Sequence, residues 1–600
     1  MDQVPIPILP GGGPDYPKHS FRAAYAKSVL AESLLAELNQ DKKKGEKLDS
    51  LPRKSLEDFA PRADGFRDDR ICIVGAGVTG LCIAMILKFL GVKEFDIIEA
   101  SDRVGGRCYT YEFPEDKEHP CPHNYYDIGA MRIPDIPTMK STLALIKDLG
   151  LEAKKVPYIL DFPKGGPVPP SMHWYTKGGP DEEPFEEVIK AVIAKLGDDF
   201  DYEKLMALGT DNFSTRSWLM VKHEWTYAQT LEAEGADTST GLFDQAFTET
   251  ICDYSDFQAA KAKPWYRLEG GMSVITDTMR DRLASTTHPR PGVPSIKPIL
   301  NSPVISMAIN DDAENTIKVT RRDGATGKDI AKDYDMVFNT TAMAPLQRMD
   351  LQGLNLPKEI LTGIRALSYD RATKVAIKFK TRWWKGFYQK PGQFGGVSSS
   401  DLPISNVVYP SWDDGDDTAA VLMVSYSWAQ DATRMGALVP EYKEGEREPK
   451  KDDEIVRVCL ENLVKLWSNE ENPPSLEFLN EQYITHHAWA WSHDPYTGGA
   501  YALFGPGQFS NLYPPFQKLL CGRRLSICGE AVSAHHAWIS GALDSAYVSL
   551  WQWLADRFHV GWINKLKESS FGPGRGKDAE ELDVTLDLWT VELSEKKGSQ

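Results

Sequence analysis

Gly75, Gly77 and Gly80 form the pattern Gly-x-Gly-x-x-Gly, and an acidic residue, Glu99, follows them in the sequence. The first glycine of such a pattern permits a tight turn, the second lets the backbone approach a pyrophosphate, and the third lets a helix pack closely on a strand. A helix that begins at this turn directs its positive N-terminus at the anion. An acid at the end of the next strand can accept hydrogen bonds from ribose hydroxyls. The pattern predicts a dinucleotide site, and the alternative for Glu99 is a plain solvated acid.

The elements around this motif are the ones it requires. Residues 71–74 (ICIV) are typical of a buried strand, residues 78–90 of a helix that ends at Gly91, and residues 95–100 (FDIIEA) of a second strand. The apolar run at residues 71–92 is long enough to cross a bilayer. Its clustered glycines and the strand that follows favour strand, turn and helix instead, so we expect no membrane span.

Further segments resemble sequence signatures of the flavin amine oxidase family, although each alone could be a loop or a helix cap. Ser101-Asp-Arg-Val-Gly105-Gly106-Arg107 resembles the segment whose Gly-Gly-Arg supports the pyrophosphate of FAD, and Ile527-Cys-Gly529-Glu530 resembles the segment that holds its ribityl-phosphate part. Gly270-Gly271-Met272 and Pro303-Val304, between them, resemble internal flavin contacts. The resemblance implies bound FAD. It implies a non-covalent flavin, because the family's covalent flavins use a C-terminal cysteine, whereas Cys521 and Cys528 precede the Gly-Glu pair.

The same resemblance places the cofactor contacts at particular residues. They are Gly75, Gly77, Val78, Thr79, Gly80, Glu99, Ala100, Gly106, Arg107, Gly129, Ala130, Met131, Arg132, Val304, Gly529, Glu530, Trp538 and Ile539.

One segment distinguishes amino acids from amines. Asp127-Ile-Gly129-Ala130-Met131-Arg132-Ile-Pro134 resembles the GxMRxP segment of L-amino-acid oxidases, in which the arginine pairs with the substrate carboxylate. A guanidinium fork can bind both oxygens in one plane, which a lysine cannot do. The alternatives for Arg132 are a contact to a cofactor phosphate and a structural ion pair.

The resemblance implies four more substrate contacts. Tyr409, at the end of an apolar strand, would also touch the carboxylate, or it is an ordinary half-buried strand tyrosine. Tyr501 and Trp538 would flank the amine as aromatic walls, with core packing as the alternative for Trp538. The backbone carbonyl of Ala537 would accept the substrate amine.

Lys374 alternates with the apolar residues Val375, Ile377 and Phe379, which places it on the polar face of a strand. A solvated lysine is the simple interpretation, and we apply it to Lys378. Lys374 itself matches the family lysine that holds a water at flavin N5, so we expect a catalytic role for it.

Other polar residues give weaker signals. His486-His487 and His535-His536 lack a third ligand at zinc spacing, and adjacent strand residues point to opposite faces, so we predict no metal. The acids Asp244, Glu249, Asp253 and Asp256 could select a basic substrate, but a solvated helix face is the preferred interpretation. The eight cysteines show no CxxC pair and are interpreted as buried thiols.

The composition excludes several classes of protein. Of 600 residues, 68 are Lys or Arg and 86 are Asp or Glu, which gives a net charge of −18. An acidic surface repels phosphate backbones and anionic lipid, so we expect no nucleic-acid or membrane partner. The first residues lack the basic and apolar regions of a secretory signal. We expect a cytoplasmic homodimer, or a secreted one if the chain is given in processed form.

Strand-like and helical segments alternate at both ends of the chain and enclose helical and mixed segments. This order predicts a mixed α/β fold with a discontinuous Rossmann-like FAD-binding domain, a mixed-sheet substrate domain and a helical insertion domain. The expected FAD-binding domain comprises residues 66–112, 265–370 and 500–565, the substrate domain 113–165 and 371–499, and the helical domain 166–264. A partly helical extension (1–65) and a C-terminal tail (566–600) flank them.

These expectations, with the resemblance, imply an FAD-dependent L-amino-acid oxidase. The α-hydrogen would leave as hydride to flavin N5, and no side-chain base would be needed if the neutral amine binds. With O₂ as acceptor, the products would be a 2-oxo acid, ammonia and hydrogen peroxide. Two alternatives stay open: an amino-acid 2-monooxygenase that yields an amide and CO₂, and a flavin-fold binding protein without turnover.

Overall fold

The computed structural model of the protein describes residues 69–556, except 161–167, 176–182, 197–204, 206, 238, 262, 287–294, 311–315, 386–393, 413, 416–417, 441–448 and 534. The predicted N-terminal extension and C-terminal tail lie outside the described residues. The domain boundaries expected from the sequence stay a prediction.

A parallel four-stranded sheet carries the Gly-x-Gly-x-x-Gly turn. Its strands lie in the order β19 (Leu525–Ile527), β11 (Met336–Asn339), β1 (Ile71–Val74) and β2 (Phe95–Ile98). All three neighbouring pairs are parallel. The strands come from segments far apart in the sequence, which confirms a mixed α/β fold with a discontinuous Rossmann-like sheet.

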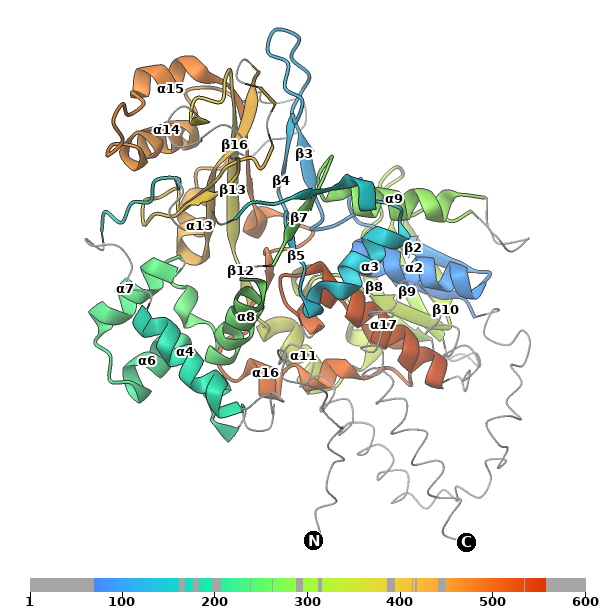
Figure 1. Cartoon of the computed structure of the whole chain (residues 1–600). Coiled ribbons are helices and arrows are strands. Elements are labelled where there is room, and N and C mark those ends of the chain that lie inside the picture. Colours follow the sequence, from blue (N-terminus) through green and yellow to red (C-terminus); the bar gives the residue numbers. More distant parts are fainter. Residues whose placement is uncertain are drawn as a thin grey trace.

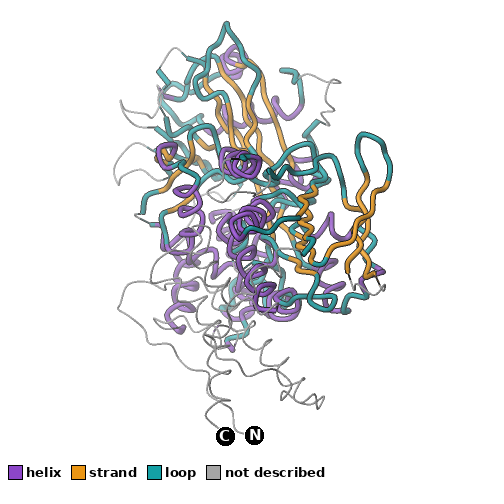
Figure 2. Tube along the Cα trace, turned by 90° about the vertical axis from the view of Figure 1, so that its right-hand side faces the viewer, coloured by secondary structure: helices purple, strands orange, loops and turns teal. Residues whose placement is uncertain are grey.

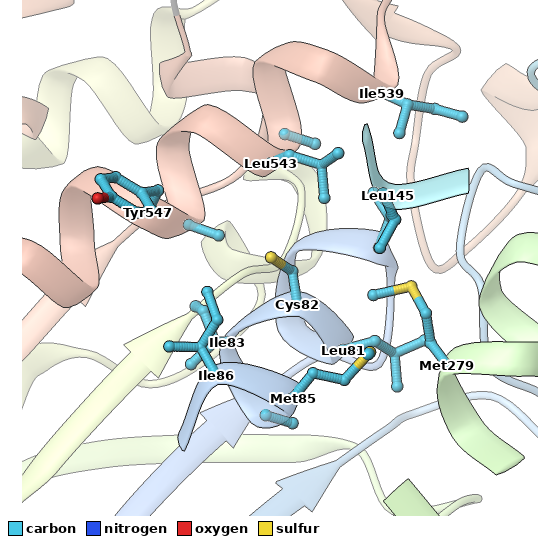
Figure 3. Close-up of a cluster of buried hydrophobic side chains, with 14 of the residues drawn as sticks. Leu81, Cys82, Ile83, Met85, Ile86, Leu145, Met279, Ile539, Leu543 and Tyr547 are labelled. Carbon is cyan, nitrogen blue, oxygen red and sulfur yellow. The ribbon is translucent and has the colours of Figure 1, made fainter. Parts of the chain in front are cut away.

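Helix α2 (Val78–Leu90) begins directly after this turn and ends, as predicted, at Gly91, which adopts a φ of 83°. Nearly all of its residues are buried, because α9 (Ser273–Ala284), α17 (Ile539–Asp556) and the sheet pack against it. Helix α3 (Lys140–Asp148) packs on α17 and belongs to the same core. Figure 3 shows Cys82 and Ile83 of α2 near Leu543 and Tyr547 of α17. A helix that is apolar all round belongs in a protein interior, which explains why this run is so apolar without spanning a membrane.

A second, antiparallel sheet packs beside the parallel one. It consists of β8 (Val304–Asn310), β9 (Thr316–Arg322) and β10 (Asp329–Tyr334). The short helices α10 (Met343–Gln347), α11 (Lys358–Ala366) and α16 (Gln508–Asn511) contribute to the same hydrophobic core.

A five-stranded antiparallel sheet forms the upper part of the molecule (Figures 1 and 2). Its order is β14 (Val397–Ser398), β15 (Asn406–Val408), β16 (Ala420–Trp428), β13 (Ala372–Phe379) and β17 (Tyr483–Ala490). Helices α13 (Ala429–Gly436), α14 (Glu454–Leu466) and α15 (Leu476–Gln482) accompany it. All eight residues of β13 are buried, because neighbouring strands and a core on each face cover it.

Small sheets connect these parts. They are β3 (Thr110–Glu112) with β4 (Tyr125–Asp127), β12 (Tyr369–Asp370) with β18 (Tyr501–Ala502), and β7 (Trp265–Leu268) between β5 (Ile133–Pro134) and β6 (Lys155–Pro157). Helices α4 (Glu183–Leu196), α6 (Thr215–Lys222), α7 (Tyr227–Asp237) and α8 (Phe247–Ala260) share a separate core at the lower left of Figure 1. Within the described part of the chain, no helix has the length and apolar character needed to cross a membrane.

Candidate active site

A cavity of about 1020 Å³ lies where the parallel sheet, the five-stranded sheet and helix α8 meet. Its walls include residues that follow the carboxyl ends of β1 and β2, residues of β13, β15 and β16, and one face of α8. Open α/β sheets bind their ligands outside the carboxyl ends of the strands. Single-ligand pockets are roughly 300–1,000 Å³, so this cavity has room for a large cofactor with a small substrate.

Two glycine-rich turns meet at one end of the cavity. Gly77 and Gly105 form a parallel bridge, and the Gly105 N–H donates to the carbonyl oxygen of Ala76 at 2.9 Å. A Cβ atom added to Gly77 would have no described atom within 4 Å, whereas one on Gly80 would lie 2.0 Å from the Gly75 oxygen. Gly77 therefore leaves open space for a ligand, and Gly80 is needed for helix–strand packing.

Glu99 directly follows the last residue of strand β2, beside this turn. One carboxylate oxygen accepts from the Ala76 N–H at 2.7 Å, and the other accepts from the N–H and hydroxyl of Ser101, both at 2.9 Å. The carboxylate thus lines the cavity and is fixed against the glycine-rich turn. The position suits the predicted bond to a ribose.

Arg107, which is half-buried, and Glu530, which is buried, form an ion pair at 2.8 Å that joins the second glycine-rich turn to the Gly-Glu segment. The other Glu530 oxygen accepts from the backbone N–H groups of Ala502 and Ala537 at 3.0 and 2.8 Å. Burial raises the pKa of Glu530, but Arg107, His536 and the Ala537 N–H together outweigh burial and hold that pKa below its ordinary value. The predicted FAD segments are thus held together around one cavity, with open backbone cradles, and fit a flavin dinucleotide.

Most predicted cofactor contacts line this cavity. They are Gly75, Gly77, Val78, Thr79, Glu99, Ala100, Gly106, Arg107, Gly129, Ala130, Met131, Arg132, Val304, Glu530, Trp538 and Ile539.

Two of the predicted contacts, Gly80 and Gly529, and the Gly270–Met272 segment do not line the cavity. Gly80 packs α2 on β1. The Gly529 N–H donates to the Ser545 hydroxyl at 2.9 Å, so this glycine shapes the turn before Glu530. The Gly270–Met272 segment holds the buried Asp127, to which the Met272 N–H donates at 2.8 Å.

Arg132 is the last residue of the loop Gly129-Ala130-Met131-Arg132, and its side chain lines the cavity. Its guanidinium carbon lies 5.4, 5.5 and 6.0 Å from the ring centres of Trp265, Phe257 and Tyr158. Among the described residues, no carboxylate forms an ion pair with it. A half-buried cation surrounded by aromatic rings suits an anionic ligand, and the structural ion pair considered from the sequence is not found among these residues.

Lys374, on β13, also lines the cavity but does not lie on a solvated polar face; it is 2% exposed. Its Nζ donates to the carbonyl oxygens of Asp127 and Gly129 at 3.0 and 2.7 Å, and it lies 4.5 Å from the Tyr426 ring centre. Burial lowers its pKa to about 7, and the charge of Arg132 acts in the same direction while Asp127 opposes it. The lysine therefore holds the loop that presents the arginine. Lys378, expected to be solvated, is also buried.

Tyr409, predicted to touch the substrate carboxylate, does not line the cavity. It is 1% exposed, its hydroxyl lies 3.0 Å from the Ser398 hydroxyl, and its ring packs near Trp467. Asn406 and Val408 face the cavity, so alternation along the chain turns Tyr409 away. Tyr426, on β16, lines the cavity instead. Burial raises the pKa of Tyr426, and the charge of Arg132 partly opposes this increase.

Tyr501, Ala537 and Trp538 all line the cavity, as expected. The Tyr501 hydroxyl donates to the Asp370 carboxylate at 3.2 Å, and burial together with that carboxylate raises the Tyr501 pKa well above its ordinary value. Ala537 adopts a φ of 65°, a strained conformation for a residue with a Cβ. Trp538 lies near Phe257, with ring centres 6.3 Å apart.

The acids of the helical region do not form one solvated face. Glu249 is 1% exposed and accepts from or donates to His536 Nδ1 at 2.8 Å, according to their protonation. Asp256 is also buried, Asp244 is largely exposed, and Asp253 lines the cavity. Within the described residues, no cluster of three or more His, Cys, Asp or Glu side chains is placed to hold a metal ion.

Comparisons with known proteins agree with this geometry. Residues 78–548 match the family model described as flavin containing amine oxidoreductase. A Dictyostelium discoideum protein named "Putative bifunctional amine oxidase" is 33% identical over 587 residues, which cover 90% of this chain and 50% of that protein. The chain thus spans half the length of this relative.

Two further likenesses are informative. "L-amino-acid oxidase 4" of Hebeloma cylindrosporum is 30% identical over 576 residues, which cover 85% of this chain and 86% of that protein. A solved structure of wild-type putrescine oxidase bound to putrescine matches with a TM-score of 0.58 at 18% identity, over 82% of this chain and 99% of that one. At this identity the structural likeness shows the fold alone.

Proposed function

Because the chain belongs to the flavin-containing amine oxidoreductase family, with FAD as its cofactor, we propose that it oxidises L-amino acids to 2-oxo acids. Ammonia and hydrogen peroxide are the other products, and O₂ is the acceptor. The identity of 30% to an L-amino-acid oxidase over most of both chains supports the choice of amino acids.

The observation that carries the proposal is the cation at Arg132. It lines the cavity among aromatic rings, and none of the described carboxylates pairs with it. A substrate carboxylate would supply two acceptor oxygens to the planar fork of the guanidinium. An amine without a carboxylate would leave this cation without such a partner in a partly desolvated place. The arginine therefore favours amino acids over simple amines.

The cofactor would be held by the groups already described. The turns around Gly77 and Gly106 would offer backbone N–H groups to the pyrophosphate, and Glu99 would accept from a ribose. Glu530, which fixes the backbone N–H of Ala502, would lie beside the ribityl part. When bound, FAD supplies the two-electron oxidant for the carbon–hydrogen bond next to the amine.

The chain itself binds and orients the substrate. Arg132 anchors the carboxylate, and Lys374 holds the loop carbonyls that fix the arginine's backbone. Tyr501 and Trp538 enclose the amine and exclude water, and the Ala537 carbonyl accepts an amine N–H. Such positioning replaces a costly search for the reactive orientation. Because the neutral amine carries its own lone pair, no side-chain base is assigned.

The test is to identify every product under air. The purified, FAD-loaded protein is incubated with each of the twenty L-amino acids, and 2-oxo acid, ammonia and peroxide are quantified. The proposal expects equal amounts of the three products from at least one amino acid. An amide and CO₂ in place of the 2-oxo acid would assign a 2-monooxygenase. Absence of turnover with any amino acid would contradict the proposal.

A further inference from the structure

One face of helix α8 forms a wall of the substrate cavity. Thr250, Asp253, Tyr254 and Phe257 line the cavity, and their spacing of three and four residues places them on one side of the helix. Phe257 lies beside the carboxylate anchor, since its ring centre is 5.5 Å from the Arg132 guanidinium carbon. This wall therefore runs from the anchor into the space beyond it.

Asp253 lies one helical turn from Phe257 on this wall. Residues four apart on a helix have Cβ atoms about 5–6 Å apart. Burial, Asp370 and Tyr426 raise the pKa of Tyr501, an expected amine wall, and the Asp253 carboxylate adds a smaller contribution in the same direction. A second acid, Asp237 at the end of α7, lines the cavity where the wall becomes exposed. The cavity thus has a cation at the anchor and negative charge beyond it.

Apolar residues also line this cavity. They include Leu160, Leu242, Val397, Val408 and Trp428. Methylene groups bury favourably against such residues, while a negatively charged or short neutral side chain would meet the carboxylate without pairing with it. A substrate side chain with a long apolar stem and a terminal cation would fit both the apolar lining residues and the Asp253 carboxylate.

We propose that Asp253 makes the site selective for L-amino acids whose side chains end in a cation, such as L-lysine and L-arginine. This inference rests on the proposed oxidation of L-amino acids. It adds the substrate class, which neither the family membership nor Arg132 defines.

Pairs of substrates that have and lack a terminal cation on a similar stem test the inference. The kcat/KM of the FAD-loaded protein is measured near neutral pH for L-lysine against L-norleucine and for L-arginine against L-citrulline. We expect the cationic member to exceed its neutral partner by about 10- to 100-fold, because the Asp253 carboxylate can accept a charge-assisted hydrogen bond from the terminal cation and gains none from the neutral analogue. In Asp253→Asn both ratios should fall towards one.

A matched control separates local pairing from the general field of the protein. Asp244→Asn removes the same charge from the same helical region, but the Asp244 side chain is 66% exposed and pairs with Arg216 outside the cavity. We expect Asp244→Asn to keep both substrate ratios of the wild type. FAD content and melting temperature are measured for both variants.

Different failures have different meanings. L-Norleucine oxidised as efficiently as L-lysine by the wild type would overturn the inference and leave the proposed function intact. An equal loss for both members of a pair in Asp253→Asn would also overturn it, since Asp253 would then serve the α-amine common to all substrates. If all four amino acids fail while putrescine is oxidised, the proposed function itself is wrong.

Discussion

Replacement of Arg132 by alanine tests the carboxylate anchor. The guanidinium is half-buried, lies within 6.0 Å of three ring centres, and has no ion-pair partner among the described residues. Removing one partner of a buried charge pair costs about 2–5 kcal/mol. Because the side chain is only half-buried, we expect the lower part of this range, a loss of roughly 30- to 400-fold in kcat/KM for L-amino acids.

The conservative variant sharpens the test. Arg132→Lys should recover part of the loss, because an ammonium retains the charge but cannot bind both carboxylate oxygens in one plane. Steady-state kinetics are measured for both variants, with FAD content and melting temperature as controls for folding. Loss of FAD from Arg132→Ala would assign the arginine to the cofactor. Full activity of either variant would refute the carboxylate role.

Three more predictions concern a lysine pKa, the retention of FAD and the corrected tyrosine. Because burial lowers the pKa of Lys374 to about 7, only the unfolded chain holds this proton between about pH 7 and the ordinary lysine pKa. The free energy of unfolding of the wild type should therefore rise across that range relative to Lys374→Met, as measured by denaturant titration at several pH values. Glu99→Ala should weaken FAD retention by about 1.5–3 kcal/mol through loss of hydrogen bonds to a charged group, as measured by FAD release on ultrafiltration. Tyr426→Phe should raise the KM for L-amino acids several-fold, whereas Tyr409→Phe should lower the melting temperature and leave KM unchanged.

Each of these has an outcome that would contradict it. A stability difference between the wild type and Lys374→Met that does not vary with pH would show that the buried lysine keeps its ordinary pKa. Unchanged FAD retention in Glu99→Ala would remove the ribose assignment. A raised KM in Tyr409→Phe, with no change in Tyr426→Phe, would restore the interpretation made from the sequence.

Motifs with a short-range cause were predictable from the sequence. The turn at Gly75 to Gly80 requires a strand before it and a helix after it. The neighbouring residues have the apolar patterns that predict both elements. The likeness of the segment around Arg132 to a known signature identified it as a candidate, and the side chain lines the cavity.

Features that depend on register or on distant partners were not predictable. Tyr409 and Tyr426 both occur near strand ends, and only the pairing of β15 with β16 decides which of them faces the cavity. Lys374 alternates with apolar residues, but β13 is an inner strand of a sheet with a core on each face, so its lysines are buried. Glu249 is polar in a helical pattern, and its burial depends on His536, which is remote in the sequence.

The most direct test of the central claim is the reduction of bound flavin without O₂. The FAD-loaded protein is mixed anaerobically with L-leucine or L-lysine, and separately with the amines that lack only the carboxylate, 3-methylbutylamine and cadaverine. Loss of the flavin absorbance is followed in time. We expect rapid loss with at least one amino acid and slow or no loss with its matched amine. Equal or faster loss with the amines would contradict it and would make the enzyme an amine oxidase.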